Sequence, residues 1–482
     1  MLTYSFDSIG DNSLYEYLYK CIKQDILNGN LTPNDKLPSK RNFAKHLGVS
    51  TITVENAYAQ LMVEGYIYSV PKKGFYVSKV YNFVNKIEHT GQRRGNVSSD
   101  SNDIIDVTKT NTKEYFFANF SSNQTDISSF PFATWAKLMR EVLHENQQEL
   151  ITNSPSGGIY ELREAIARHL KDFRGVEVSP KQIIIGAGTE YLYGLIIQLL
   201  GFDKKYGVEN PGHRKIAQIY ESHHVSCEHI AMDHSGILVD DLKKKNIDVI
   251  HISPSHHFPT GIIMPINRRY ELLNWASEDE RRYIIEDDYD SEYRLIGQPI
   301  PALQNIDTME KVIYINTFTK TLASTIRISY MVLPMHLLDE FYDRLSFYSC
   351  TVSNFEQYTL ARFIEEGYFE KHLNRMRTFY HGRRDALLQA IRNSLLSKKV
   401  TILEEDSGLH FLIRIQMDQT DEEFCKACME NEIKIVPVSD YYQSKKESAK
   451  HVFIINYSSI LEENMDEAVD RIYQALMKME MC

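Results

Sequence analysis

LPSKRNFAKHLGVSTITVENAYAQLMVEGYIYSVPKKGFYV, residues 37–77, determines the architecture of the N-terminal part of the chain. Ser39 is placed as the N-cap of a first helix, which Gly48 ends. Ser50 or Thr51 is placed to cap a second helix, whose inner face is apolar. Two short helices joined by a tight turn that contains glycine form a helix-turn-helix.

Residues on both sides of this stretch complete a small domain. Upstream, apolar residues at steps of three and four predict a helix that Gly29 ends. The residues of this apolar stripe are Leu14, Leu18, Ile22, Ile26 and Leu27. Downstream, residues 66–70 and 75–78 flank a turn and predict a β-hairpin with a basic tip. We therefore predict a mainly helical domain with a β wing over residues 1–80.

Charge is unevenly distributed along the chain. The first 80 residues contain nine Lys and Arg and seven Asp and Glu, a net charge of +2. The whole chain has a net charge of −11, so the remainder carries −13. A mildly basic domain joined to an acidic body is typical of a DNA-binding domain fused to a module that does not bind DNA. The excess is small, however, and charge alone does not identify the domain.

The order of helix, helix-turn-helix and basic hairpin closely resembles the winged helix of GntR-type bacterial repressors, over residues 12–80. The resemblance implies that residues 50–62 form the recognition helix in the major groove of operator DNA. The implied DNA-binding residues are Lys40 and Arg41 at phosphates, Ser50, Thr51 and Thr53 at base edges, and Lys72, Lys73 and Gly74 along the minor groove. Some members have arginines where this chain has Thr51 and Glu55, so the base preference does not carry over.

Residues 81–113 are rich in Gly, Ser, Asn, Asp and Thr and show no periodicity, which predicts a linker. The chain of 482 residues then divides into a winged helix-turn-helix domain over 1–80, the linker, and a large domain over 114–482. Hydrophobic residues make up 43% of the whole chain, which is enough to bury a sizeable core.

Helical stretches alternate with short apolar strands in the large domain, which predicts a mostly parallel α/β sheet. The predicted strands are residues 182–185, 205–208, 249–252, 283–286, 312–316 and 329–333. Polar or glycine-rich segments follow the carboxyl ends of these strands, where open α/β sheets bind ligands. We expect these segments to meet in one crevice.

Four of these polar features together suit pyridoxal phosphate. Lys320 can form a Schiff base with the cofactor, and Asp287 can keep its pyridine nitrogen protonated. Arg327 and the backbone N–H groups near Gly188 and Thr189 can hold a phosphate. The glycine segment alone is weak evidence, because it completes neither a Walker loop nor a dinucleotide fingerprint.

This set of residues closely resembles fold-type I aminotransferases, and with the winged helix the whole chain resembles the MocR subgroup of GntR regulators. Specific stretches are SGGIYELREAIARHL, GAGTEYLYGLIIQLL, VENPGHRK, SPSHHFPTGIIMP, RRYIIEDDYDSEYR and NTFTKTLASTIRISYMVLP. The resemblance implies Lys320 as the catalytic aldimine lysine and Asp287 as the partner of the pyridine nitrogen. It implies Tyr289 at the ring 3-oxygen, His213 stacked on the ring and His257 near it. The implied phosphate ligands are Gly188, Thr189, Thr317, Thr319 and Arg327.

One departure from the aminotransferase pattern concerns the substrate carboxylate. Aminotransferases clamp the α-carboxylate with an arginine in a segment like FIRLSY, but this chain has Ile454 at that position. A second effector-binding arginine of the subgroup aligns with Lys215, next to Arg214. We therefore expect ordinary amino-acid transamination to be weak or absent.

The sequence indicates a PLP-dependent bacterial transcriptional regulator that binds operator DNA and senses an effector through Lys320. The effector is PLP itself or an amine or amino acid, and the missing arginine favours PLP. The alternative is an active aminotransferase with an accessory DNA-binding domain; a further alternative is a cofactor-free dimerisation body. The resemblance also implies a homodimer with head-to-tail exchange of domains.

Other classes of protein and site are disfavoured. The longest apolar runs are far shorter than the ~20 residues of a membrane span, and no secretory signal is evident. Six cysteines do not form a disulfide framework, so we expect a cytoplasmic protein. The pair Cys425 and Cys428 is isolated, and the cluster of Asp287, Asp288 and Asp290 with nearby histidines suits pyridoxal better than a metal. We predict no metal site.

Overall fold

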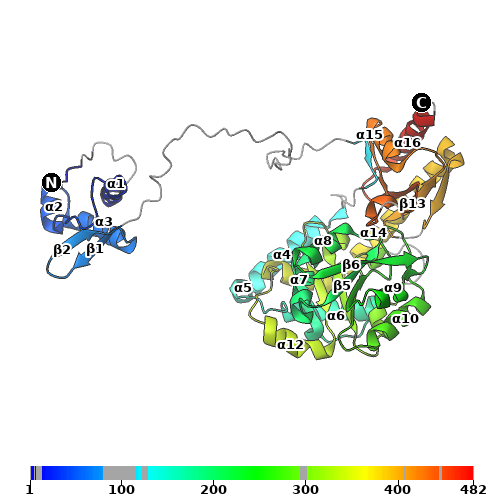
Figure 1. Cartoon of the computed structure of the whole chain (residues 1–482), viewed down its shortest axis with the longest axis horizontal. Coiled ribbons are helices and arrows are strands. Elements are labelled where there is room, and N and C mark those ends of the chain that lie inside the picture. Colours follow the sequence, from blue (N-terminus) through cyan, green and yellow to red (C-terminus); the bar gives the residue numbers. More distant parts are fainter. Residues whose placement is uncertain are drawn as a thin grey trace. The chain divides into compact units, whose positions relative to one another are not determined.

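The computed structural model divides the chain into two compact units, residues 1–110 and 111–482 (Figure 1). It describes residues 2–4, 6, 13–79, 116–121, 129–293, 301–405, 408–444 and 448–480. The predicted linker, residues 81–113, lies outside the described residues.

The N-terminal unit contains the three predicted helices: α1 (Leu14–Leu27), α2 (Lys40–Leu47) and α3 (Thr51–Val63). The Ser39 side chain accepts a hydrogen bond from the backbone N–H of Asn42 and caps α2. Gly48 ends α2 with φ +69°, a conformation that favours glycine. The Ser50 side chain caps α3 by accepting from the N–H of Thr53. These local caps hold α2 and α3 in a helix-turn-helix.

The wing is the antiparallel hairpin of β1 (Ile67–Val70) and β2 (Gly74–Val77). Its inner side chains join a core with Leu18, Ile22, Phe43, Val54, Tyr58 and Leu61 from the helices. The hydroxyl of the fully buried Tyr58 donates to the carbonyl of Pro38 at 3.0 Å. The predicted winged helix-turn-helix is confirmed.

The large unit is built on a mixed sheet whose strand order is β4-β11-β10-β9-β8-β5-β6-β7. The strands are β4 (Ile183–Gly186), β5 (Lys205–Asn210), β6 (Ser226–Asp233), β7 (Gly236–Ile237), β8 (Val249–Ile252), β9 (Tyr283–Asp287), β10 (Val312–Thr317) and β11 (Ser329–Val332). Strands β10, β9, β8, β5 and β6 are parallel neighbours. The prediction of a mostly parallel α/β sheet is confirmed.

β11 runs antiparallel to both of its neighbours, β10 and β4. Only the short segment between Thr317 and Ser329 joins β10 to β11, and it contains the brief helix α11 (Phe318–Thr321). A parallel crossover needs a dozen or more residues, usually with a full helix, so the chain turns back instead. This return places α11 at the carboxyl end of β10.

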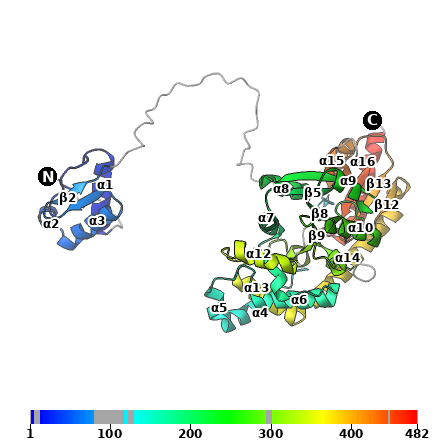
Figure 2. The same ribbon diagram turned by 60° about the horizontal axis from the view of Figure 1, so that its bottom comes forward.

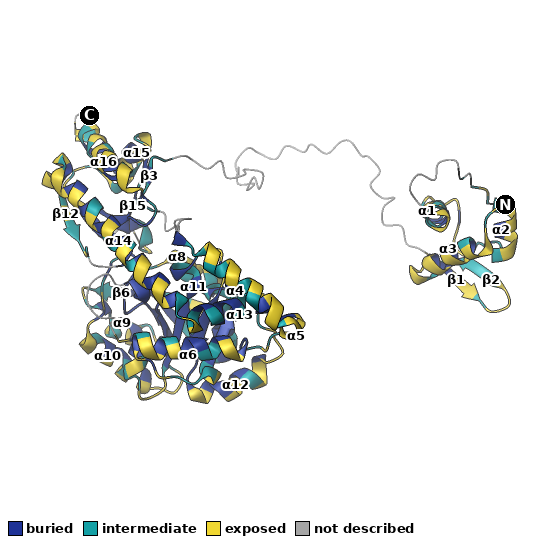
Figure 3. Cartoon of the chain, turned by 180° about the vertical axis from the view of Figure 1, so that it is seen from behind, coloured by how far each residue is buried: buried dark blue, intermediate teal, exposed yellow. Residues whose placement is uncertain are grey.

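Helices cover both faces of the sheet (Figures 2 and 3). They are α4 (Phe132–Glu145), α5 (Gln147–Ile151), α6 (Tyr160–Arg174), α7 (Thr189–Leu200), α8 (Arg214–Ser222), α9 (Val239–Lys244), α10 (Ile266–Ser277), α12 (Met335–Leu345) and α13 (Asn354–Glu365). In β4, Ile184 packs toward α7, α8 and α12, whereas Ile183 and Ile185 pack toward α4, α6 and α13. This alternation buries the strand on both faces. None of the described helices is long and apolar enough to cross a membrane.

A second, smaller sheet lies in the C-terminal part of the large unit, in the order β12-β13-β16-β15. Its strands are β12 (Val400–Leu403), β13 (His410–Ile415), β15 (Val436–Pro437) and β16 (Val452–Asn456). It packs with α14 (Tyr368–Asn393), α15 (Asp421–Glu430) and α16 (Met465–Glu480) in one apolar core. The short strand β3 (Ala118–Asn119) pairs in parallel with β14 (Ile433–Lys434) in this region. The described segment that follows the predicted linker is therefore attached to the C-terminal part.

A buried ion pair joins α6 to the sheet. The guanidinium of Arg174 lies 2.8 Å from Asp288 Oδ2, and both side chains are 1% exposed. The Tyr314 hydroxyl donates to the same oxygen at 2.6 Å. Two further acids, Glu286 and Glu292, are buried nearby, and burial followed by the charge of Asp288 raises the pKa of each. Arg174 therefore balances a group of carboxyls that lies in the interior.

We expect Arg174→Met to lower the free energy of unfolding of the large unit by about 3–5 kcal/mol, because it leaves Asp288 buried without its cation. Both tryptophans of the chain, Trp135 and Trp275, lie in this unit, so urea unfolding followed by tryptophan fluorescence reports on it alone. Lys171→Met on the same helix is the control, because the Lys171 side chain is 62% exposed and its ion-pair partner in the described part of the chain, Glu177, is also exposed. Equal losses in the two variants would contradict the expectation.

Candidate functional site

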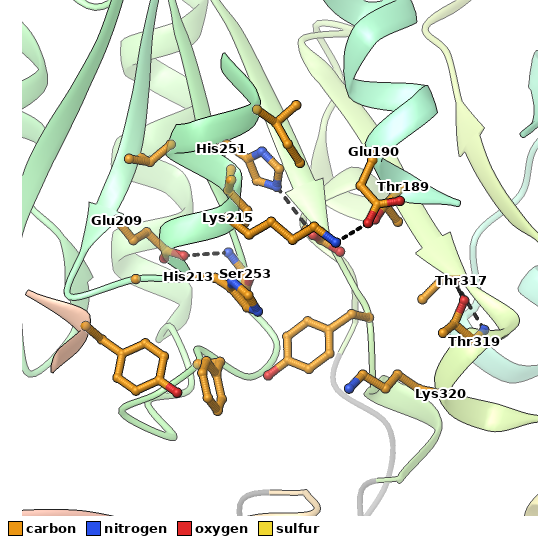
Figure 4. Close-up of a pocket in the computed structure, with 18 of the residues that line it drawn as sticks. Thr189, Glu190, Glu209, His213, Lys215, His251, Ser253, Thr317, Thr319 and Lys320 are labelled. Carbon is orange, nitrogen blue, oxygen red and sulfur yellow. Dashed lines mark hydrogen bonds and ion pairs between the residues drawn. The ribbon is translucent and has the colours of Figure 1, made fainter. Parts of the chain in front are cut away.

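A cavity of about 370 Å³ lies at the carboxyl ends of the central strands (Figure 4). The predicted strands in this region are β4, β5, β8, β9 and β10. At or just beyond the carboxyl end of each strand, at least one residue lines the cavity. The C-terminal sheet closes another side through Val436 and Ile454. Eight predicted cofactor residues line the cavity: Thr189, His213, Asp287, Tyr289, Thr317, Thr319, Lys320 and Arg327. The expected convergence on one crevice is thus observed.

An anion cup lies at the N-terminus of α7. Gly188 is the N-cap of this helix with φ +97°, and Thr189 is its first residue. A side chain at Gly188 would collide with the guanidinium of Arg327, so the glycine lets the arginine lie against the backbone. Backbone N–H groups at a helix N-terminus and an adjacent guanidinium favour an anion such as a phosphate.

The other side of the cup is a network of hydroxyl groups around α11. The Thr317 side chain caps α11 by accepting from the N–H of Thr319 at 3.1 Å. The Thr317 and Thr319 hydroxyls are hydrogen bonded at 2.8 Å, and Ser329 donates to Thr317 at 2.8 Å. This network holds α11, and with it Lys320, in one orientation.

The amine of Lys320 is suited to attack a carbonyl carbon. The side chain lines the cavity and is partly buried. Burial lowers the pKa of Lys320, and the charge of Asp290 opposes this shift only in part. A lowered pKa increases the fraction of neutral amine near pH 7, and only the neutral amine is nucleophilic.

The Asp287 carboxylate is held through one of its two oxygens. Its Oδ2 accepts a hydrogen bond from the Tyr193 hydroxyl at 2.6 Å and lies 3.4 Å from His251 Nε2. The Tyr220 hydroxyl contacts the other ring nitrogen of His251 at 2.9 Å, which orients the imidazole. Asp287 Oδ1 is buried and has no hydrogen-bond partner among the described residues.

These features fit pyridoxal phosphate. The unpartnered oxygen of Asp287 can pair with a protonated pyridine nitrogen, which makes the ring an electron sink. The lowered pKa of Lys320 suits its reaction with the aldehyde, and the cup at Gly188 suits the phosphate. Burial, followed by the charges of Asp290 and Asp287, raises the pKa of Tyr289, so its hydroxyl can donate to the ring oxygen.

The two predicted histidines, His213 and His257, differ in their positions. His213 is exposed on the cavity wall, and its ring centroid is 5.9 Å from that of Phe258. His257 is not among the residues that line the cavity; it is buried, with Nε2 3.5 Å from Glu209 Oε2. Burial lowers the pKa of His257 to about 3 and raises that of Glu209 to about 8. Both groups are therefore mainly neutral at pH 7.

The sequence prediction did not include several residues that line the cavity, among them Tyr193, His251, Glu209 and Glu190. His251 and Glu209 have a detectable signal, because each is a polar residue at or next to a predicted buried strand. Tyr193 gives no such signal in an apolar helix, since its partner Asp287 is 94 positions away.

The predicted DNA-binding residues lie on α2, α3 and the wing. Arg41, Thr51, Lys72 and Lys73 are exposed, whereas Lys40, Thr53 and Gly74 are partly exposed. Lys40 pairs with Glu55 of α3 at 2.6 Å. The exposed Ser50 is the N-cap of α3, so its side chain also has a structural partner. These residues belong to the unit that the fold identifies as a winged helix.

Comparison with known protein families matches both units. Residues 14–77 match the model of bacterial regulatory proteins of the gntR family, and residues 117–472 match the model of aminotransferase class I and II. The chain is 36% identical to the uncharacterized HTH-type transcriptional regulator YhdI of Bacillus subtilis, covering 98% of each chain. It is 30% identical to the probable rhizopine catabolism regulatory protein MocR of Rhizobium meliloti, covering 98% of this chain and 96% of the relative.

Solved structures agree with the fold of the large unit. The multiple substrate aminotransferase from Thermococcus profundus superposes with a TM-score of 0.67 at 24% identity, over 77% of this chain and 94% of that one. A Pyrococcus horikoshii kynurenine aminotransferase gives a TM-score of 0.66 at 22% identity, over 76% and 92%. The aminotransferase class I and II family implies pyridoxal 5′-phosphate as the cofactor. The chain thus belongs to the MocR-type regulators of the GntR family, DNA-binding transcriptional regulators that carry an aminotransferase-like domain.

Proposed function

We propose that this regulator senses pyridoxal phosphate, or an amine that reacts with it, through covalent attachment of the cofactor to Lys320. The observation that carries the proposal is that Lys320, Asp287 with its unpartnered oxygen, and Arg327 of the anion cup all line one cavity. Ligand binding that favours one arrangement of the large unit changes DNA affinity by the same coupling free energy, typically about 1–3 kcal/mol.

The individual roles form part of the proposal. Lys320 attaches the cofactor, Asp287 pairs with its ring nitrogen and Tyr289 donates to its ring oxygen. His213 stacks on the ring, and His257 supports the site through Glu209. The phosphate ligands are Gly188, Thr189, Thr317, Thr319 and Arg327. In the N-terminal unit, Lys40 and Arg41 hold DNA phosphates, Ser50, Thr51 and Thr53 contact base edges, and Lys72, Lys73 and Gly74 follow the minor groove.

The wall formed by the C-terminal sheet favours an effector without a carboxylate. Ile454 lies on this wall with Val436, Tyr441 and Phe258, and all four line the cavity. A carboxylate placed against this apolar wall would lose its hydration without gaining a bidentate partner. Pyridoxal phosphate itself is therefore the preferred effector, and a non-carboxylated amine comes next.

The alternative function, a working aminotransferase, differs from a sensor because an enzyme turns over amino donors and keto acids. Rapid half-transamination of a series of amino donors, followed by turnover on a keto acid, would support an enzyme. The absence of an arginine at Ile454 argues against this alternative, because a charge-assisted clamp of the substrate carboxylate is missing from this wall.

The proposal also includes a homodimer in the cytoplasm, in which the two copies exchange domains head-to-tail. The proposed domain boundaries are residues 1–80 for the DNA-binding domain, 81–113 for the linker and 114–482 for the large domain. Several large apolar side chains of the large unit are exposed, and a second copy of the chain would cover them. They include Phe132, Ile151, Phe347 and Phe355. A dimer would contact two half-sites of an operator.

Borohydride reduction after incubation with pyridoxal phosphate should label the peptide that contains Lys320. The variant Lys320→Ala should lose the label and, in gel-shift titrations on DNA obtained by in vitro selection, the cofactor-dependent change in affinity. Lys426→Ala, at an exposed lysine of α15 outside the cavity, should retain both. A wild-type protein whose label lies on other lysines would refute the proposed attachment.

The variant Ile454→Arg should bind a simple α-amino acid at least about tenfold more tightly than wild type, because it restores a bidentate partner for the carboxylate. The measurement is the change in absorbance of the cofactor-loaded protein during amino-acid titration. Ile454→Met controls for altered packing, since Ile454 is only 3% exposed. No gain in a variant that still binds the cofactor would show that this wall does not face the effector.

The two kinds of DNA contact predict different effects of substitution. Arg41→Ala should weaken binding equally on specific and nonspecific DNA and reduce the slope of log K against log salt by about 1, because one phosphate contact is lost. Thr51→Ala should leave the salt slope unchanged and reduce the ratio of specific to nonspecific affinity. Fluorescence anisotropy at several salt concentrations measures both, and the reverse pattern would contradict the assignment.

A further inference from the structure

One carboxylate in the anion cup binds two cations at once. Glu190 lies in the first turn of α7, directly after Thr189. One of its oxygens pairs with the Lys215 amine and the other with the Arg327 guanidinium. Figure 4 shows Lys215 reaching across the cavity to Glu190 beside Thr189. All three ionic side chains line the cavity, so the pair of salt bridges lies within the site itself.

The carboxylate is ionised near neutral pH. Burial alone would raise the pKa of Glu190, but the hydrogen bond from Lys215 and the charge of Arg327 outweigh it, and the pKa is lowered. The side chain of Glu190 is 34% exposed and that of Arg327 is 45% exposed, so an incoming anion can reach both. The guanidinium of Arg327 also lies against Gly188, which is the backbone of the cup.

A phosphate group and Glu190 compete for Arg327. A phosphate monoester carries between about 1.5 and 2 negative charges at pH 7. Two cations and one carboxylate give the cup a net charge of only +1, to which the helix N-terminus adds about half a charge. A phosphate that pairs with Arg327 must therefore displace the carboxylate or accept a like charge beside it, and either choice costs binding free energy.

We propose that Glu190 is a built-in competitor of the cofactor phosphate, which makes cofactor binding weak enough to follow the cofactor concentration. This inference rests on the proposed function and adds a means of regulation to it. A site responds most steeply when the ligand concentration is near its dissociation constant, whereas a very tight site stays saturated. The same salt bridge to Lys215 also occupies a cation that an effector carboxylate could otherwise use.

The test is equilibrium titration of the full-length protein with pyridoxal phosphate, followed by the absorbance of the bound cofactor. The variant Glu190→Gln keeps the size and hydrogen-bonding capacity of the side chain but removes its charge. It should bind about tenfold more tightly and release the cofactor more slowly on dilution, because Arg327 becomes available to the phosphate and a negative charge beside it is removed. Glu190→Asp, which is too short to span both cations, should show a smaller gain.

The matched control is Glu221→Gln, since Glu221 is exposed on α8, the helix of Lys215, and does not line the cavity. Its affinity should equal that of wild type. Inorganic phosphate provides a second measurement without covalent chemistry: it should inhibit cofactor binding at about tenfold lower concentration in Glu190→Gln than in wild type. Tryptophan fluorescence confirms that each variant is folded.

Unchanged or weaker cofactor binding in folded Glu190→Gln, together with normal labelling of Lys320 in wild type, would overturn this inference and leave the proposed function standing. An equal gain in Glu221→Gln would also overturn it, because the effect would then be one of overall charge. Failure of wild type to bind the cofactor at all would overturn both.

Discussion

A carboxylate taken out of water must be held by hydrogen bonds, and the Asp287 carboxylate is where this requirement organises the large unit. Its partners come from two other elements: Tyr193 from α7 and His251 from β8. The N-terminus of the same α7 forms the anion cup, so one helix both anchors the acid and supplies the cup. The cavity can therefore have the correct dimensions only when α7, β8 and β9 are packed in register.

The strands around this carboxylate could be predicted from sequence because they are buried on both faces. Every residue of β8 and β10 is buried, and polar residues at or just beyond their carboxyl ends line the cavity. β6 was missed because it lies near the edge of the sheet and mixes exposed and buried positions. The C-terminal sheet was also missed, since its strands β12 and β15 are short and only partly buried.

In the candidate site, too, residues placed by their local sequence could be predicted, whereas contacts between residues far apart in the sequence could not. Predicted cofactor positions such as Lys320 lie soon after a strand end, so the sequence order predicts their place in the cavity. The salt bridge from Arg327 to Glu190 joins residues 137 positions apart, and no local pattern indicates it. In the N-terminal unit most decisive contacts are local caps, of which Ser39 and Ser50 are examples, and the sequence predicts them well.

The parallel pairing of β3 with β14 has a mechanical consequence. β3 lies close to the point where the chain enters the large unit, and the backbone N–H of Asn456 bonds the carbonyl of Phe120 just beyond it. Asn456 also lines the cavity, on the same strand as Ile454. A ligand that shifts β16 therefore also moves Phe120 and the adjoining β3 through this hydrogen bond, without any rearrangement of the large sheet.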